Sequence, residues 1–334
     1  MTTDASTGIS NSRSTPAILL LGGSGFVGQA VCEMLLRRYG GSARITVPTR
    51  RLAHAQNVQT LPGVTVVQAD VHDDQALQRL VASHDVVINL IAILQGSEAA
   101  FEQAHVALPR RIAAACAATG VKRLIHVSAI GADAAAPSRY LRSKGRGEQV
   151  LHVAEQTHGL QLTLLRPSVI FGRGDRFLNL FARLQALFPL LPLAGAHARF
   201  QPVWVEDVAQ AVVACVQDAS TIGQTYELAG PTVATLAELV RLAGQVSGHP
   251  RPILPLPAPL AWLQAVMMEL LPGVPLMSRD NIASMRVPNV AGGMLPGLET
   301  LGITPSSAAA VLPGYLAPGA GCQRLDLWRA RHRG

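Results

Sequence analysis

The sequence predicts an α/β protein with a doubly wound parallel sheet and a smaller, mostly helical C-terminal lobe. Three observations predict it. An apolar run at 17–21 leads through a glycine-rich turn into a segment whose apolar residues recur at helical spacing. Strand-like and helix-like segments then alternate through the first half of the chain. After Pro167 this alternation gives way to helices separated by proline- and glycine-rich linkers.

The first half of the chain supplies the elements of the predicted sheet. Short apolar and β-branched runs predict further strands at 44–47, 64–68, 85–91, 123–128 and 161–165. Helical periodicity predicts helices between them at 73–82, 98–119 and 138–158. In the second half the same criterion predicts helices at 177–187, 205–217, 235–247 and 259–271.

The turn at 21–29, Leu-Gly-Gly-Ser-Gly-Phe-Val-Gly-Gln, is the most informative stretch. Gly22 allows a turn that a side chain would block, Gly25 lets the backbone approach a pyrophosphate, and Gly28 lets the helix pack on the strand. The helix N-terminus adds unpaired N–H groups and partial positive charge. We therefore expect a Rossmann-type dinucleotide pocket rather than a plain tight turn. Its predicted cofactor-binding residues are Gly22, Gly25, Phe26, Val27 and Gly28.

The second strand bears on the choice of nicotinamide cofactor. An NAD site normally has an Asp or Glu there, roughly 20 residues beyond the glycines, that binds the ribose 2'-hydroxyl. Here no acidic residue occurs between Glu33 and Asp70, and the strand runs into Arg50 and Arg51. Because a guanidinium makes paired hydrogen bonds to a 2'-phosphate, Arg50 favours NADP(H), with NAD(H) still possible. The alternative is that both arginines are ordinary surface charges.

Tyr140 and Lys144 are four residues apart, so they share one face of the predicted helix 138–158. Reduction of a carbonyl by a nicotinamide needs a proton donor at the oxygen, and a neighbouring cation lowers the pKa of a tyrosine. Ser128, at the end of the fifth strand, could hydrogen-bond the substrate oxygen. Tyr140, Lys144 and Ser128 are thus the candidate catalytic residues. The alternative is an exposed helix pair without a chemical role.

With 334 residues, the chain suits one nucleotide-binding domain with a smaller lobe grafted on. We expect a disordered polar leader at 1–15, the nucleotide-binding domain at 16–165, the lobe at 166–318 and a basic tail at 319–334. Within the lobe, strands at about 200–230 return to the sheet. The leader lacks the apolar core of a signal peptide.

The formal net charge of +7 does not indicate a nucleic-acid site, because the basic residues form no stripe with interleaved aromatics. The basic tail predicts a solvated terminus, or contact with anionic lipid or an acidic partner. The cysteines lie far apart, so neither a metal site nor a disulfide framework is expected, and a reducing compartment fits. They are Cys32, Cys116, Cys215 and Cys322.

No apolar run reaches the roughly 18 to 20 residues that a membrane-spanning helix needs. The apolar run that comes nearest to this length is segment 259–271. Its apolar residues predict a helix buried in the lobe, with a helix lying on a membrane surface as the alternative. The residues that share its apolar face are Leu260, Leu263, Met267 and Leu270. The apolar stretch at 187–193 favours an apolar or quinone-like ligand, or a protein contact, over a charged sugar.

Four segments carry a family resemblance: 128–133 (SAIGAD), 140–148 (YLRSKGRGE), 166–179 (RPSVIFGRGDRFLN) and 201–209 (QPVWVEDVA). Together with the glycine turn, they resemble the atypical short-chain dehydrogenase/reductases. This group includes the NADPH-binding accessory subunit of respiratory complex I and its bacterial relatives. The likeness covers about residues 16 to 230.

The resemblance implies roles for further residues. The glycine turn and Arg50 would bind the dinucleotide, and Tyr140 and Lys144 would face its ribose and nicotinamide. The backbone that closes the fourth strand would pass beside the cofactor. An Asp after a strand is also a common helix cap, which is the alternative for Asp70. The additional positions are Asp70 and Val71 at the adenine, Asn89 and Leu90 beside the cofactor, and Pro167 and Val169 on the nicotinamide side.

The resemblance implies an NADP(H)-binding protein of the accessory-subunit type, with a structural or regulatory nucleotide. Its partner would be a respiratory complex or another membrane-peripheral protein, and its place the cytoplasmic face of a bacterial inner membrane. The alternatives are an active reductase, a sugar-nucleotide epimerase or dehydratase that uses Tyr140 and Lys144, and a soluble redox sensor. In a sugar-nucleotide enzyme, the diphosphate could bind three arginines of the lobe, Arg173, Arg176 and Arg199. The alternative is that these arginines form ion pairs with Glu206 or Asp207.

Overall fold

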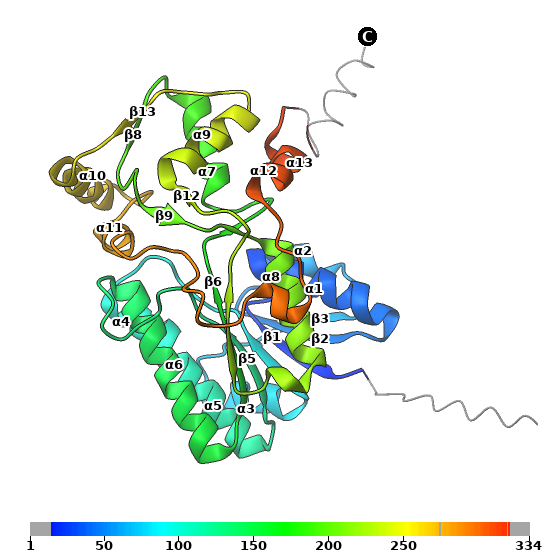
Figure 1. Cartoon of the computed structure of the whole chain (residues 1–334). Coiled ribbons are helices and arrows are strands. Elements are labelled where there is room, and N and C mark those ends of the chain that lie inside the picture. Colours follow the sequence, from blue (N-terminus) through cyan, green and yellow to red (C-terminus); the bar gives the residue numbers. More distant parts are fainter. Residues whose placement is uncertain (1–14, 274, 319, 321–334) are drawn as a thin grey trace, which may run out of the picture.

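The computed structural model describes residues 15–273, 275–318 and 320 (Figure 1). Its centre is a seven-stranded sheet in the order β11-β6-β5-β4-β1-β2-β3, and every neighbouring pair is parallel. The predicted α/β fold with a doubly wound parallel sheet is therefore confirmed. The strands are β1 (Ala17–Leu21), β2 (Arg44–Thr49), β3 (Val64–Gln68), β4 (Val86–Asn89), β5 (Arg123–Val127), β6 (Gln161–Pro167) and β11 (Gln224–Leu228).

Helices cover both faces of the sheet, which explains the continuous apolar run of β1. Ile18 and Leu20 point into one core, and Leu19 and Leu21 point into the other. On the first face lie α1 (Phe26–Tyr39), α2 (Gln56–Gln59) and α8 (Val205–Gln217). On the second lie α3 (Asp74–Ala82), α5 (Leu108–Thr119) and α6 (Arg139–His158).

The predicted helix at 98–119 is interrupted by a π-helical turn. The chain runs through α4 (Glu98–Glu102), the π turn Gln103–Ala107 and α5. The π turn approaches α6 so closely that a Cβ at Gly147 would overlap the carbonyl oxygen of His105. Its main consequence is the placement of His105, which is buried.

The C-terminal lobe packs over the carboxyl edge of the sheet (Figure 1). Its core joins α7 (Leu178–Leu187) to α9 (Leu236–Val246). The remaining helices are α10 (Ala258–Leu270), α11 (Arg279–Ser284), α12 (Ala308–Val311) and α13 (Pro313–Leu316). Short strand pairs connect them: β7 (Ile170–Phe171) with β10 (Val203–Trp204), β8 (Leu191–Leu193) with β13 (Ile253–Pro255), and β9 (Arg199–Phe200) with β12 (Ala234–Thr235).

Helix α10 forms where the periodicity predicts a helix, but the expectation that its apolar face is buried in the lobe is wrong. Only the small side chains of Ala261 and Ala265 are buried. Leu260 and Met267 are 50% and 60% exposed. Within the described ranges no helix is long and apolar enough to cross a bilayer. The basic tail, Cys322 and nearly all of the expected leader lie outside the described residues.

Candidate functional site

The glycine turn connects β1 to α1 at the carboxyl edge of the sheet. Gly22 has φ +84°, in the left-handed region that favours glycine. A Cβ at Gly28 would overlap the carbonyl oxygen of Gly22, so the first turn of α1 can pack on the loop only without a side chain there. Gly25 precedes the helix and offers no side-chain cap. The turn is therefore a bare backbone cradle.

This cradle fits a pyrophosphate. The N–H groups of Phe26, Val27 and Gly28 lie in the first turn of α1, where no intrahelical acceptor exists. Such groups, with the positive end of the helix dipole, bind phosphate oxygens. Gly23 is not among the residues predicted from the sequence, but a Cβ there would lie 2.6 Å from Cγ2 of Val47 and push the turn away from β2.

Arg50 follows β2 at the same edge and is exposed. No acid within the described residues pairs with its guanidinium. The loop after β2 is tied to the glycine turn, because the Asn57 side-chain amide donates to the Ser24 carbonyl oxygen at 3.3 Å. Thr49 anchors the loop by donating to the Arg51 carbonyl oxygen at 3.0 Å. The loop that carries Arg50 is thus tied to the glycine turn.

Asp70 and Val71 follow the end of β3. Asp70 is exposed, and its carboxylate accepts from the His72 N–H at 3.0 Å. The N-cap of α3 is Asp73, so the helix-cap alternative for Asp70 is wrong. Val71 beside it is 8% exposed.

Asn89 is fully buried at the end of β4. Its side-chain amide nitrogen lies 3.0 Å from Nδ1 of His126, and its amide oxygen accepts from the Ile91 N–H at 3.1 Å. Leu90 donates its N–H to the Leu21 carbonyl oxygen at 2.9 Å. These bonds hold the ends of β1, β4 and β5 side by side under the glycine turn.

Lys144 is only 2% exposed, so the alternative of an exposed helix pair is wrong. Its Nζ donates to the Val127 carbonyl oxygen at 2.8 Å. Burial lowers the pKa of Lys144 to about 8, and Glu148 opposes this shift. Burial also raises the pKa of Tyr140 to about 12, whereas the sequence analysis expected the neighbouring cation to lower it. Burial of the phenol, and not the neighbouring cation, determines the direction of this shift.

Ser128 lies directly after Val127 and is 3% exposed. Its Oγ has no hydrogen-bond partner within the described residues. Because a buried hydroxyl without a partner costs about 1 to 3 kcal/mol, such a group marks the place of a polar ligand atom. Ser128 therefore fits the predicted contact to a bound group at this edge.

His105, which is not among the residues predicted from the sequence, supports Tyr140. Nε2 of His105 accepts from the Ile93 N–H at 3.1 Å, so Nδ1 carries the proton and donates to Ser143 Oγ at 2.8 Å. Ser143 in turn donates to the Tyr140 carbonyl oxygen at 2.8 Å. The His105 and Tyr140 rings meet edge-on, with centroids 5.6 Å apart. Burial and the nearby Lys144 lower the pKa of His105 to about 3, which keeps this imidazole neutral.

Asn289, from the C-terminal lobe, forms hydrogen bonds with the segment that is predicted to lie beside the nicotinamide. Its Oδ1 accepts from Ser168 Oγ and from the Val169 N–H, both at 2.7 Å. Pro167 ends β6 directly before these two residues and is buried. The resemblance stopped near residue 230, so no local sequence pattern pointed to Asn289.

The three lobe arginines, Arg173, Arg176 and Arg199, are exposed. Neither proposed acid pairs with them. Glu206 pairs with Arg37 at 3.3 Å, and Asp207 accepts from the Ser306 N–H at 2.7 Å.

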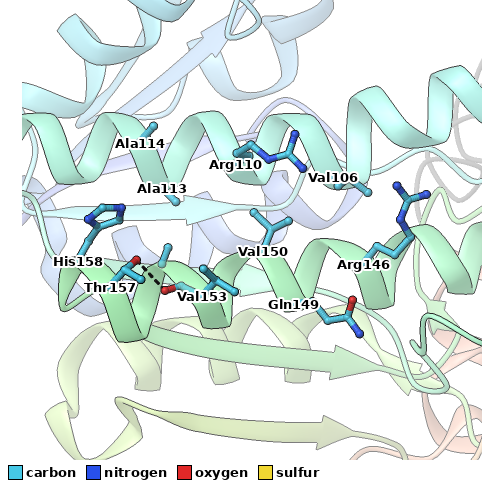
Figure 2. A pocket seen from close by; sticks show the side chains of 11 residues that line it. Val106, Arg110, Ala113, Ala114, Arg146, Gln149, Val150, Val153, Thr157 and His158 are labelled. Atoms are coloured by element: carbon cyan, nitrogen blue, oxygen red, sulfur yellow. Dashed lines mark hydrogen bonds between the residues drawn. The ribbon is translucent and has the colours of Figure 1, made fainter.

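A groove of about 480 Å³ lies on another side of α6, between α5 and α6 (Figure 2). Its lining is mainly alanine and valine and includes Arg110 and Arg146. Arg146 is paired with Glu102 at 2.9 Å. The groove shares no residue with the predicted cofactor site, and it brings together no pair of groups suited to acid–base or nucleophilic chemistry.

Comparison with known proteins agrees with this geometry. The family model "NAD dependent epimerase/dehydratase family" matches residues 18–229. The chain is 33% identical over 297 residues to the mouse protein NADH dehydrogenase [ubiquinone] 1 alpha subcomplex subunit 9, mitochondrial, covering 86% of this chain and 76% of that one. The Arabidopsis thaliana protein of the same name is 30% identical over 314 residues, covering 89% and 75%.

Solved structures support the fold. DesIV, a dTDP-glucose 4,6-dehydratase from Streptomyces venezuelae with NAD and TYD bound, has a TM-score of 0.70 at 19% identity and covers 95% of this chain and 98% of that one. A UDP-glucuronic acid 4-epimerase from Bacillus cereus in complex with NAD has a TM-score of 0.64 at 17% identity, covering 81% and 100%. The chain belongs to the NAD dependent epimerase/dehydratase family, and its sequence is similar to accessory subunits of respiratory complex I.

Proposed function

We propose that this protein binds NADP(H) as a structural or regulatory nucleotide and works as an accessory protein of a respiratory complex. The observation that carries the proposal is the glycine cradle, in which Gly22 and Gly28 leave space that a Cβ would fill. A bare cradle at a helix N-terminus suits a pyrophosphate. The nicotinamide would supply hydride chemistry when bound.

Arg50 supports NADP(H) rather than NAD(H). It occupies the position after β2 where an acid would bind a ribose 2'-hydroxyl, and it is exposed beside the cradle. A guanidinium there neutralises a 2'-phosphate and donates two hydrogen bonds to it.

A structural role for the nucleotide is supported by the state of Tyr140. A phenol whose pKa is raised to about 12 gives up its proton reluctantly, and Lys144 is committed to the Val127 carbonyl oxygen. Tyr140 and Lys144 are then contacts to the nucleotide rather than an acid–base pair.

Active turnover is the second candidate function. One observation favours it: the partnerless hydroxyl of Ser128 is available to a substrate oxygen. A reductase, or an epimerase or dehydratase of sugar nucleotides, would use this serine with Tyr140 and Lys144.

The names of the relatives support a respiratory-complex partner, since the mouse and plant proteins are subunits of the ubiquinone-linked NADH dehydrogenase. We place this protein at the cytoplasmic face of a bacterial inner membrane. The apolar residues of the 187–190 stretch are exposed, with Leu187 and Phe188 at 76% and 52%. Their exposure favours contact with another surface over an enclosed quinone-like ligand.

The test is to purify the protein, denature it and identify the nucleotide released. We expect NADPH that exchanges slowly and is not oxidised by carbonyls or quinones. Tyr140→Phe should retain the same nucleotide at the same occupancy. Turnover that disappears in Tyr140→Phe would overturn the structural role, and recovery of neither pyridine nucleotide, with no binding by the stripped folded protein, would overturn the cofactor site.

A further inference from the structure

Segment 275–296 of the C-terminal lobe forms a strap across part of the carboxyl edge of the sheet (Figure 1). The strap is hydrogen-bonded to the segments that follow β4, β5 and β6 and to β11 itself, which are four neighbouring strands. The bonds run from Gln95 Nε2 to the Pro275 carbonyl oxygen at 2.8 Å, from the Tyr140 N–H to Asp280 at 3.1 Å, from the Val169 N–H to Asn289 Oδ1 at 2.7 Å, and from the Gly292 N–H to Glu227 at 2.6 Å.

The other half of this edge is not crossed by the strap. Within the described residues, no hydrogen bond joins the strap to β1, β2 or β3 or to the loops that follow them. The glycine turn, Arg50 and Asp70 lie in that half, where the proposed site binds the adenosine half of the nucleotide. Tyr140 and segment 167–169, which would face the nicotinamide half, lie where the strap crosses.

Two buried side-chain atoms in the described part of the chain have no hydrogen-bond partner, Ser128 Oγ and Gln95 Oε1. Both follow strands in the half that the strap crosses, and the Gln95 side chain is itself bonded to the strap. Because a buried polar atom without a partner costs free energy, these two atoms indicate a polar ligand on this side. The carboxamide and ribose hydroxyl groups of a nicotinamide nucleotide carry the donors that both oxygens can accept.

Asn289 fastens the strap at the end of β6. Its Oδ1 accepts from Ser168 Oγ and from the Val169 N–H, both at 2.7 Å. Its backbone N–H donates to the Arg199 carbonyl oxygen at 2.9 Å, and its carbonyl oxygen accepts from the Gln201 N–H at 2.9 Å. The backbone of Asn289 is thus held by the lobe, while its side chain is bonded to the predicted nicotinamide-side segment. The strap cannot leave the edge of the sheet without breaking these side-chain bonds.

We infer that the strap encloses the nicotinamide half of the bound nucleotide and that Asn289 is the positioning residue that keeps it closed. Release of the complete nucleotide then requires the strap to move off the edge. A ligand made of the adenosine half alone occupies the uncovered side and is released without this step. The inference rests on the proposed nucleotide site, and it gives the slow exchange expected there a structural cause.

The test compares NADPH with adenosine 2',5'-bisphosphate, which is the adenosine half of NADPH, on the full chain. Asn289→Ala removes two hydrogen bonds that hold the strap, so it should raise the dissociation rate of NADPH at least about tenfold and leave the affinity for the bisphosphate unchanged. Stopped-flow fluorescence gives the rate, and isothermal titration gives the affinity. Gln264→Ala is the matched control, because it removes a side-chain amide that bonds to the Pro192 carbonyl oxygen within the lobe, and it should change neither value.

Amide hydrogen exchange of the wild-type chain tests the strap without a substitution, since NADPH should protect segment 280–292 more than the bisphosphate does. Equal protection by the two ligands would overturn the inference, as would an unchanged NADPH dissociation rate in Asn289→Ala. An equal loss of affinity for both ligands in that variant would indicate a general structural defect and overturn it too. Failure of the stripped, folded wild-type chain to bind either ligand would overturn the proposed nucleotide site itself, and the inference with it.

Discussion

The carboxylate of Asp280 accepts a hydrogen bond from the backbone N–H of Tyr140 at 3.1 Å, across 140 residues of sequence. The other carboxylate oxygen accepts from the Arg139 N–H at 2.7 Å. Asp280 therefore caps the start of α6 from the C-terminal lobe. The lobe thus fixes the first turn of the helix that carries the candidate reaction centre.

Asp280→Ala should destabilise the protein by about 1.5 to 3 kcal/mol, because it removes an ionised acceptor from two N–H groups and from the positive end of a helix. Denaturant unfolding measures this change. Asp74→Ala is the control, since its exposed pair with Arg111 is worth at most about 1 kcal/mol. Equal losses in the two variants would show that the Asp280 cap contributes no more than a surface ion pair.

Gly28→Ala should abolish nucleotide binding. A Cβ there overlaps the Gly22 carbonyl oxygen, so the glycine turn must open or α1 must move. Isothermal titration with NADPH measures the effect. Gly41→Ala is the control because its Cβ would meet nothing within 4 Å. Binding by Gly28→Ala with wild-type affinity would contradict the cradle as the pyrophosphate site.

The glycine turn and the sheet could be predicted because their causes are local. Gly22 needs a positive φ and Gly28 a close approach, and each requirement leaves a glycine at a fixed distance after a buried strand. The positions of Arg50 and Ser128 could be predicted for a similar reason. Each residue comes directly after a parallel strand, and the carboxyl ends of parallel strands lie at one edge of the sheet.

The rest of the site depends on long-range contacts. Asp280 and Asn289 reach residues more than 100 positions away, and no local pattern distinguishes them from ordinary polar residues. The π turn at His105 is not visible in helical periodicity. For α10, the spacing identifies the apolar face, but whether another element covers that face is decided by tertiary packing alone.

Arg50→Ala should weaken NADPH binding by about tenfold or more and leave NADH binding unchanged, because only NADPH carries the 2'-phosphate that the guanidinium would bind. Binding constants for both nucleotides, measured on the stripped protein, give the ratio. Arg44→Ala, an exposed cation at the opposite end of β2, is the control for a general loss of positive charge. Equal losses for NADPH and NADH would contradict the assignment of Arg50.

His105 should make the protein less stable as the pH falls. Its pKa is lowered to about 3 from an ordinary value near 6.5, so between these values the unfolded chain binds a proton that the folded chain does not. The free energy of unfolding should therefore decrease by about 1.4 kcal/mol per pH unit for this group as the pH falls below about 6.5. The pKa of buried His126 is also lowered, which adds to the same trend.

His105→Gln isolates the contribution of His105, because glutamine can donate to Ser143 but does not titrate. Urea unfolding at several values between pH 5 and pH 7 should show a smaller pH dependence in the variant than in the wild type. His158→Gln, at an exposed position, is the control for the loss of a histidine. Parallel pH profiles for wild type and His105→Gln would mean that the imidazole titrates normally in the fold, and the neutral tautomer assigned from the Ile93 N–H would then be wrong.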